Sequence, residues 1–327
     1  MAELLPLGPV LLIGEALVDE FADGPVAGGA PLNVARSLAS LGQAARLASR
    51  VGQDDAGALR IRQAMRRSGL SERGLQLDAR HPTGRVHIVE GPQGHRFEIA
   101  RVAAWDHLDP HPVLALAEAE QPGVVYFGSL QLRRFATRLR LGNMLKALDQ
   151  GGRLFFLDLN LRDDSRDPEI AEACLHQADW LKVNDEELAQ LMQWFLPGAD
   201  PTETEPLALQ DAVGRLMRRF DLRLLVLTRG PLGHAAFAAD GSLVAEGPAS
   251  PVAHLVDTVG AGDAFSAMLL AATLAGRALP EALRLASGFA AAMCGERGPA
   301  PADPAFFHPW REALGLAPLQ PSLAEIR

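Results

Sequence analysis

The sequence predicts an α/β protein with a mostly parallel sheet that helices cover on both faces. Two observations support this fold class. From about residue 110, short apolar segments alternate with longer helical stretches, and strands that are apolar throughout are typical of parallel sheets buried on both faces. Nearer the N-terminus, two alternating segments flank a Gly-Pro-Gln-Gly loop and predict a β-hairpin outside this pattern.

The first elements follow from local signals. A short apolar strand is expected at 10–14, and the turn-rich link "DGPVAGGAP" follows it. A helix at 31–41 has a proline near its start and Gly42 just past its end, and a second helix at 54–68 is stopped by Gly69. The hairpin strands are expected at 85–90 and 96–101, around the turn Gly91-Pro92-Gln93-Gly94.

The remainder of the chain supplies the parallel sheet. Strands are expected at 124–128, 154–159, 180–183 and 224–228, alternating with helices at 133–148, 168–178, 185–195 and 207–220. A second hairpin, with strands at 235–238 and 243–245, turns at Asp240-Gly241, and helices at 262–275 and 281–294 complete the core. Ligands of such sheets bind beyond the carboxyl ends of the strands. Polar residues that follow strands, such as Asp158, Asn160 and Arg162, are therefore candidates for the site.

Composition narrows the class of protein. The 327 residues suffice for one large domain, and a net charge of −9 spread along the chain argues against a nucleic-acid or anionic-membrane surface. Cys174 and Cys294 stand far apart, and the N-terminal segment lacks a basic region before its interrupted apolar run. These features predict reduced thiols in a cytoplasmic protein without a membrane span.

The scarcity of lysine restricts the kinds of phosphate site. The chain has two lysines, Lys146 and Lys182, and neither stands in a P-loop or in a Val-Ala-Ile-Lys strand. A phosphate site here must therefore rely on backbone N–H groups and arginines.

The segment "DTVGAGDAF", from Asp257 to Phe265, carries the strongest chemical signal. Small residues that open a helix expose unpaired N–H groups to an anion, and the helix dipole adds positive charge. Asp263, kept ionised by that dipole, is then placed to accept a proton from an attacking hydroxyl. The alternatives are an ordinary first-turn acid or a dinucleotide-binding loop, which is disfavoured because Phe265 stands where the third glycine belongs.

Two further segments have two interpretations each. "GGAPLN", from Gly28 to Asn33, is either a second close approach to a ligand or a strand–helix turn. Asn184 and Glu187 have the spacing of a capping box. They also fit a metal–phosphate site in which Glu187 contacts Mg²⁺ through water, because Mg²⁺ keeps part of its hydration shell.

Together these segments resemble the ribokinase-like (PfkB) carbohydrate kinase family. "DTVGAGDAF" is similar to its C-terminal signature and "GGAPLNVARSLASLG…VGQDDAG" to its N-terminal one. "GEALVDEF", "LDLNLR", "KVNDEE" and "LTRGPLG" also match, in the order of the family, so that the resemblance spans about residues 10–301.

The resemblance implies a ribokinase-like fold and a phosphoryl transfer. It implies a single kinase domain over 1–327 with a small β lid from about 15–30 and 84–102, and ATP and Mg²⁺ as cofactors. The base would be Asp263, and the anion hole would be the backbone N–H groups of Gly260, Ala261 and Gly262. The remaining implied residues fall into three groups: Asp19, Gly29, Asn33, Arg101 and Arg162 toward the sugar and phosphates; Asn184, Thr228, Gly230, Gly233 and Ser287 toward the nucleotide; and Glu187 and the carbonyl of Asp257 toward Mg²⁺ and a monovalent cation such as K⁺.

The sequence departs from the family at two places that concern the sugar. Met268 replaces a glycine often found three residues after the signature phenylalanine, and Ala100 replaces an aromatic residue before the lid arginine. The loop Gly28–Pro31 also lacks the lysine of the Gly-Gly-Lys-Gly form that members acting on ribose or phosphorylated sugars often carry.

"GEALVD" with "GGAPLN" most resembles fructokinases, then 2-keto-3-deoxygluconate kinases, then nucleoside kinases. A non-catalytic sugar sensor is disfavoured because it would need no base at Asp263. The expected partners are a small sugar and ATP. A two-stranded hairpin is marginal alone, so we expect the lid to close over the sugar or to pair with the lid of a second subunit in a homodimer.

Overall fold

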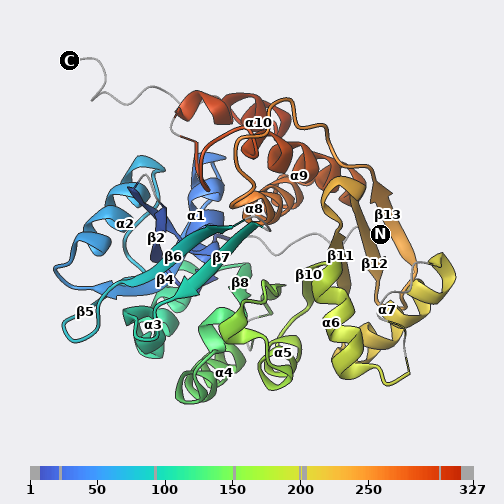
Figure 1. Cartoon of the computed structure of the whole chain (residues 1–327), viewed down its shortest axis with the longest axis horizontal. Helices are drawn as coiled ribbons and strands as arrows, with labels where there is room; N and C mark the ends of the chain where they lie inside the picture. The colour runs from blue at the N-terminus through green and yellow to red at the C-terminus, as the bar shows by residue number, and fades with distance from the viewer. Residues whose placement is uncertain are drawn as a thin grey trace.

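The computed structural model describes residues 8–21, 24–91, 94–149, 152–198, 200, 205–301 and 303–317. Its strands form two sheets. The larger has nine strands in the order β13-β12-β11-β10-β9-β8-β1-β4-β5, and the smaller has four in the order β3-β2-β6-β7. In Figure 1 the smaller sheet lies to one side, close to α1, α8 and β8.

The larger sheet is parallel except at one edge, as the sequence predicts. Its parallel strands are β1 (Val10–Ile13), β4 (Ala45–Gly52), β5 (Leu75–Asp78), β8 (Val124–Gly128), β9 (Leu154–Asp158), β10 (Trp180–Asn184) and β11 (Leu224–Thr228). The predicted second hairpin, β12 (His234–Ala238) and β13 (Leu243–Gly247), extends the sheet in the antiparallel sense.

Helices cover both faces of this sheet (Figure 1). On one face lie α1 (Ala30–Ser40), α2 (Ala56–Arg67), α8 (Ala261–Leu274) and α9 (Leu279–Met293), and on the other lie α3 (Pro110–Glu120), α4 (Phe135–Asp149), α5 (Pro168–Leu175), α6 (Asp185–Phe195) and α7 (Pro206–Phe220). Strand β1 shows the alternation: Val10 and Leu12 belong to the first core, and Leu11 and Ile13 belong to the second. A strand buried on both faces is therefore apolar at every position.

Short helical segments complete the chain. They are the 3₁₀ turns η1 (Ala104–His107), η2 (Leu130–Leu132), η3 (Asp163–Ser165), η4 (Gly230–Leu232) and η5 (Pro304–Phe307), and the helix α10 (His308–Ala313). Among the described residues, no helix has both the length and the apolar character needed to cross a bilayer. Cys174 and Cys294 are both buried and unpaired.

The smaller sheet corrects two predictions. The link "DGPVAGGAP" contains a strand, β3 (Gly24–Gly28), which pairs with β2 (Leu17–Phe21). The hairpin of β6 (Gly84–Gly91) and β7 (Gly94–Ile99) does not stand alone, because β6 pairs in parallel with β2. A strand that carries Pro25 is tolerated here because β3 is an edge strand. The strands reach Gly91 and Gly94, so the predicted four-residue turn is shorter, and its residues 92–93 lie outside the described part.

Other differences concern boundaries. Helix α2 begins after Asp55, whose side chain accepts a hydrogen bond from the Ala58 N–H, rather than at residue 54. Helix α4 begins at Phe135 because residues 130–132 form a 3₁₀ turn instead. Strands β4 and β5 and helix α3 were not predicted. Helix α3 starts at Pro110 with Asp109 as its cap, which is an ordinary helix start that the sequence did contain.

Candidate active site

A cavity of about 490 Å³ lies between the two sheets at the carboxyl ends of the parallel strands. Gly128, Asn184 and Thr228 line it from the ends of β8, β10 and β11, and Lys182 lines it from the middle of β10. The smaller sheet covers the opposite side with apolar side chains, namely Leu17, Val86 and Ile99. The cavity thus has a polar floor built on the larger sheet and a partly apolar cover built on the smaller one.

The N-terminus of α8 faces this cavity. Gly260 caps the helix in the left-handed region, at φ 82°, and a Cβ atom there would come within 2.8 Å of the Pro299 Cα. Glycine is therefore required at this cap. Gly260, Gly262 and Asp263 line the cavity, and Ala261 lies between them in the first turn. The Ala261 N–H donates to the Thr258 carbonyl oxygen at 3.2 Å, and the other N–H groups of this helix start favour an anion.

Asp263 is held by a residue from a distant part of the chain. Its Oδ2 accepts a hydrogen bond of 2.8 Å from the Nδ2 of Asn33, which lies in the first turns of α1. Burial raises the pKa of Asp263, and the hydrogen bond from Asn33 acts in the opposite direction. The expected effect of the helix dipole is thus outweighed by burial. A carboxylate with a raised pKa is a stronger proton acceptor, which suits a general base.

Two more carboxyl groups line the same cavity. Burial raises the pKa of Glu15 and that of Asp19 to about 7 in each case. Positive charge on Arg162 lowers the pKa of both groups, as it does for Asp263. Arg162 is therefore the cation that these three acids share, at the end of the cavity that the smaller sheet covers.

The paired glycines of "GGAPLN" allow a close approach of backbone to these acids. A Cβ atom on Gly28 would overlap the Asp19 carboxylate. Gly29 has φ 104°, and a Cβ atom there would come within 2.6 Å of the Glu15 carbonyl oxygen. Glu15 also accepts a hydrogen bond of 3.1 Å from the Ala30 N–H, the first residue of α1. The segment is therefore both a strand–helix turn and part of the cavity wall.

A buried ion pair lies beneath the α8 N-terminus. Lys182 Nζ is 3.0 Å from Asp158 Oδ1, and Asp158 Oδ2 accepts hydrogen bonds from Ser266 Oγ at 2.7 Å and Tyr126 OH at 3.2 Å. A Cβ atom added to Gly262 would lie 3.2 Å from Lys182 Nζ, so the ammonium group is next to the first turn of α8. This network attaches the helix start to the central strands.

Asn184 and Glu187 form the predicted capping box and also line the cavity. Glu187 Oε2 accepts from the Asn184 N–H at 2.9 Å, and Oε1 accepts from the Leu161 N–H at 2.8 Å. Both oxygens keep a lone pair for water, so the residue fits a metal contact through water. Within the described ranges, no group of three or more His, Cys, Asp or Glu side chains is assembled to hold a metal ion directly.

Besides Ala261, five of the residues that the resemblance implied do not line the cavity. Arg101 lies exposed just after β7, and Gly230 and Gly233 lie in the turn between β11 and β12. Ser287 is buried in α9, where its Oγ accepts from the Ser250 N–H. The Asp257 carboxylate accepts from the N–H groups of Val259 and Gly298, and so joins two loops next to α8.

Sequence reasoning missed Glu15 and Lys182 as members of the site. The signal for Lys182 was present, since a charged residue inside the apolar strand "WLKVN" needs a buried partner. No comparable signal singled out Glu15, because its role depends on the start of α1 being folded against it.

The model of the pfkB family of carbohydrate kinases matches residues 16–305. A fructokinase of Klebsiella pneumoniae is 32% identical over 84% of this chain and 87% of that protein, and fructokinase-1 of Oryza sativa subsp. japonica is 29% identical over 90% and 94%. The chain therefore belongs to the pfkB family of carbohydrate kinases. Its enzymatic class is that of phosphotransferases that act on a sugar hydroxyl.

Solved structures agree with this family in fold. A fructokinase from Vibrio cholerae O395 in fructose-, ADP- and calcium-bound form superposes with a TM-score of 0.73 at 22% identity, over 92% of this chain and 98% of that chain. A structural neighbour from E. coli in complex with ATP and Mg²⁺ has a TM-score of 0.73 at 21% identity, over 90% and 94%. The predicted ribokinase-like fold is confirmed.

Proposed function

We propose that this protein transfers the γ-phosphate of ATP to a hydroxyl group of fructose. The observation that carries the proposal is the position of Asp263. It lies in the first turn of α8, beside free helix N–H groups, and it is hydrogen-bonded to Asn33 from the start of α1. A base and an anion site thus share one end of a cavity that the small sheet covers.

The proposed steps assign these residues as follows. Asp263 accepts the proton of the attacking sugar hydroxyl, and the amides of Gly260–Gly262 stabilise the negative charge on the phosphoryl group in transfer. Asn33 orients the Asp263 carboxylate. The proton moves from the sugar oxygen to the Asp263 oxygen as the new oxygen–phosphorus bond forms. The bond between the γ-phosphorus and the bridging oxygen breaks at the same time, and ADP leaves with that electron pair.

The nucleotide is proposed to lie along the ends of β10 and β11. Asn184 and Thr228 line the cavity there, with Gly230, Gly233 and Ser287 as outer candidates. Mg²⁺ would neutralise charge on the phosphates when bound, and the buried Glu187 fits its hydration shell. A contribution of the Asp257 carbonyl to K⁺ binding stays a prediction, which activity measured in potassium against sodium would test.

The sugar is proposed to lie between the floor and the small sheet, with Asp19, Gly29 and Asn33 as its polar contacts. An uncharged ketose fits this end better than a sugar acid. The cavity holds three carboxyl groups that interact with Arg162, so a substrate carboxylate would compete with them for this cation. Arg101, the other arginine expected toward the sugar and phosphates, does not line the cavity.

The small sheet is proposed to act as the lid of a single kinase domain that spans the chain. Its apolar residues Leu17 and Val86 face the cavity, which favours closure over the sugar. Pairing of two lids in a homodimer, and a cytoplasmic location, stay predictions. Sedimentation of the purified protein, with and without sugar, would test the first.

The test is ADP release measured across a panel of acceptors: fructose, 2-keto-3-deoxygluconate, ribose and a nucleoside. We expect fructose to have the highest kcat/KM. A kcat/KM for 2-keto-3-deoxygluconate about tenfold above that for fructose would overturn the assignment, since one good polar contact is worth about that factor. The Arg101→Ala variant would then identify the carboxylate contact.

A further inference from the structure

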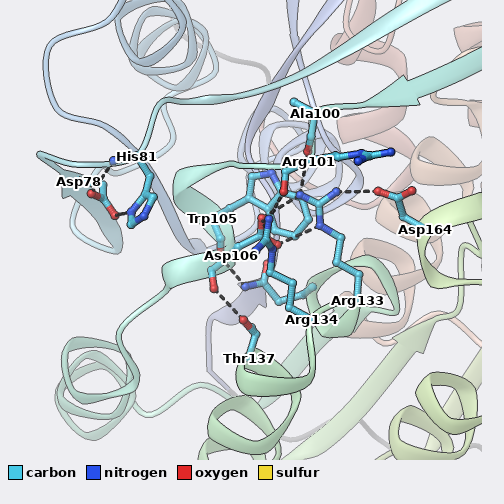
Figure 2. Close-up of polar contacts among 11 residues, drawn as sticks. Asp78, His81, Ala100, Arg101, Trp105, Asp106, Arg133, Arg134, Thr137 and Asp164 are labelled. Carbon is cyan, nitrogen blue, oxygen red and sulfur yellow. Dashed lines mark hydrogen bonds and ion pairs between the residues drawn. The ribbon is translucent and has the colours of Figure 1, made fainter.

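A cluster of charged and aromatic residues lies where the β6–β7 hairpin of the small sheet joins the larger domain (Figure 2). Asp106 in η1 is fully buried, and Arg133, between η2 and α4, is nearly so, with its side chain 5% exposed. Arg133 Nε donates to Asp106 Oδ1 at 2.9 Å and Nη2 donates to Asp106 Oδ2 at 2.8 Å. This two-point pairing defines the direction of the guanidinium plane.

The same guanidinium group contacts the end of the hairpin directly and its start through Trp105. Arg133 Nη2 donates to the carbonyl oxygen of Ala100, one residue after β7 ends, at 2.9 Å. Its other face covers the Trp105 ring, with 4.2 Å from Cζ to the ring centroid. A Cβ atom on Gly84, the first residue of β6, would lie 2.5 Å from Trp105 Nε1. The start of β6 thus packs on the indole that Arg133 covers.

Arg133 also reaches the loop that carries Arg162. Its Nη1 donates to Asp164 Oδ2 at 2.8 Å, and Asp164 lies two residues after Arg162. Figure 2 shows Asp164 on one side of Arg133 and the Asp106 cluster on the other. The Arg133 side chain therefore connects the C-terminal end of the lid hairpin, at Ala100, to the loop that carries Arg162.

The surrounding contacts keep this cluster rigid. Arg134 pairs with Asp106 at 3.1 Å and donates to the carbonyl oxygen of Arg101. Thr137 Oγ1 donates to the Asp106 carbonyl oxygen at 2.7 Å, so the first turn of α4 also holds η1. Buried charges without such partners would be costly. The C-terminal end of the hairpin is thus anchored to η1 and to the start of α4.

We propose that Arg133 is a positioning residue. It fixes the position of the lid hairpin relative to the Arg162 loop, so that both segments contact the sugar at the same time. The inference rests on the proposed position of the sugar under the small sheet. Arg133 lies outside the cavity lining and touches no reacting group, so it acts through the two segments that it joins.

The experiment compares Arg133→Met with Arg138→Met, a matched arginine on α4 that pairs with the exposed Glu169. We expect Arg133→Met to raise the sugar KM about tenfold, with kcat and the KM for ATP within about threefold of the wild type. Arg133→Lys, which keeps the charge but not the fork, should recover part of the loss. An unchanged sugar KM, or a rise equal to that of Arg138→Met, overturns the proposal.

A second readout needs no substrate. Amide hydrogen exchange in β6 and β7 should become about tenfold faster in Arg133→Met, while exchange in α8 stays as in the wild type. Equal exchange in the hairpin would show that Arg133 does not set the lid. If the wild type phosphorylates no sugar, the proposed function fails, whereas this comparison still decides the role of Arg133.

Asp164→Asn should leave folding unaffected, because the Asp164 side chain is 43% exposed. It weakens the bond from Arg133 to the Arg162 loop and leaves the Asp106 pairing intact. We expect a sugar KM several-fold higher with an unchanged Tm. A sugar KM of Asp164→Asn equal to that of the wild type would overturn the claim that Arg133 connects the lid to the Arg162 loop.

Discussion

The floor of the cavity and its cover are built in different ways. The floor rests on the central strands, where the Lys182–Asp158 pair, Tyr126 and Ser266 form one buried network under α8. The cover is a four-stranded sheet whose own apolar cluster has two buried residues, Leu17 and Val86, among the side chains that the structure describes.

This difference separates the two tasks of a sugar kinase. Groups that do the chemistry need fixed geometry, and a network of buried charges on central strands provides it. Groups that admit and select the sugar need to move, and elements with few buried contacts open at low cost in free energy. Changes in the floor should therefore affect kcat and stability, and changes in the cover should affect the sugar KM.

The largest effect is expected at Asp263. Asp263→Asn removes the proton acceptor while keeping the hydrogen-bonding shape, so kcat should fall by roughly 10²–10⁴, the usual contribution of a positioned base. The Kd for ATP should change little, and circular dichroism should be unchanged. Activity equal to the wild type would remove Asp263 from the chemical step.

The buried pair should dominate the stability of the floor. Lys182→Met leaves Asp158 without its cation, and breaking a buried pair in this way costs about 3–5 kcal/mol. Urea unfolding should show this loss, whereas Lys146→Met, the only other lysine and exposed on α4, should be within about 0.5 kcal/mol of the wild type. A small loss in Lys182→Met would mean that the floor is held mainly by apolar packing.

In the cover, replacing Asp19 should affect use of the sugar and not the affinity for ATP. Asp19→Ala removes a polar contact and should lower kcat/KM for the sugar about tenfold or more, leaving ATP affinity intact. Glu20→Ala is the matched control, because Glu20 is the next residue of β2 and pairs instead with Arg85 and His87. Equal effects of the two substitutions would place the sugar elsewhere.

The last effect is spread over several pH units. Glu15 and Asp19 have a pKa of about 7 in the folded protein, above the ordinary values of 4.5 and 3.8. Between about pH 4 and pH 7 the folded protein therefore holds protons that the unfolded chain releases. Each group's contribution to stability decreases as the pH rises through this window and is lost above about pH 7. The decrease is at most about 1.4 kcal/mol per pH unit and group.

Urea unfolding without ligand, at about pH 6 and about pH 8, would measure this decrease. The double variant Glu15→Gln/Asp19→Asn should lose the decrease that these groups cause, and Glu118→Gln on the exposed face of α3 should keep it. A decrease of the same size in the double variant would assign the pH dependence to other groups.

The sequence by itself determined the class of fold and the chemistry of one helix start. Fully apolar strands alternating with helices predict a parallel sheet, and "DTVGAGDAF" predicts an anion site next to Asp263. Such signals are local, because the spacing of apolar residues and the absence of a Cβ atom act within a few residues. The hairpin at 85–101 was found for the same reason.

Contacts between distant segments were decided only by the tertiary structure. Asn33 meets Asp263 across 230 residues of chain, and Lys182 meets Asp158 because β9 and β10 are neighbours in the sheet. Strand β2 turned a predicted lone hairpin into a four-stranded sheet through pairing with β6. Burial raises the pKa of Glu15 and Asp19. Desolvation depends on all the residues packed around a group, and the local sequence does not show which residues these are.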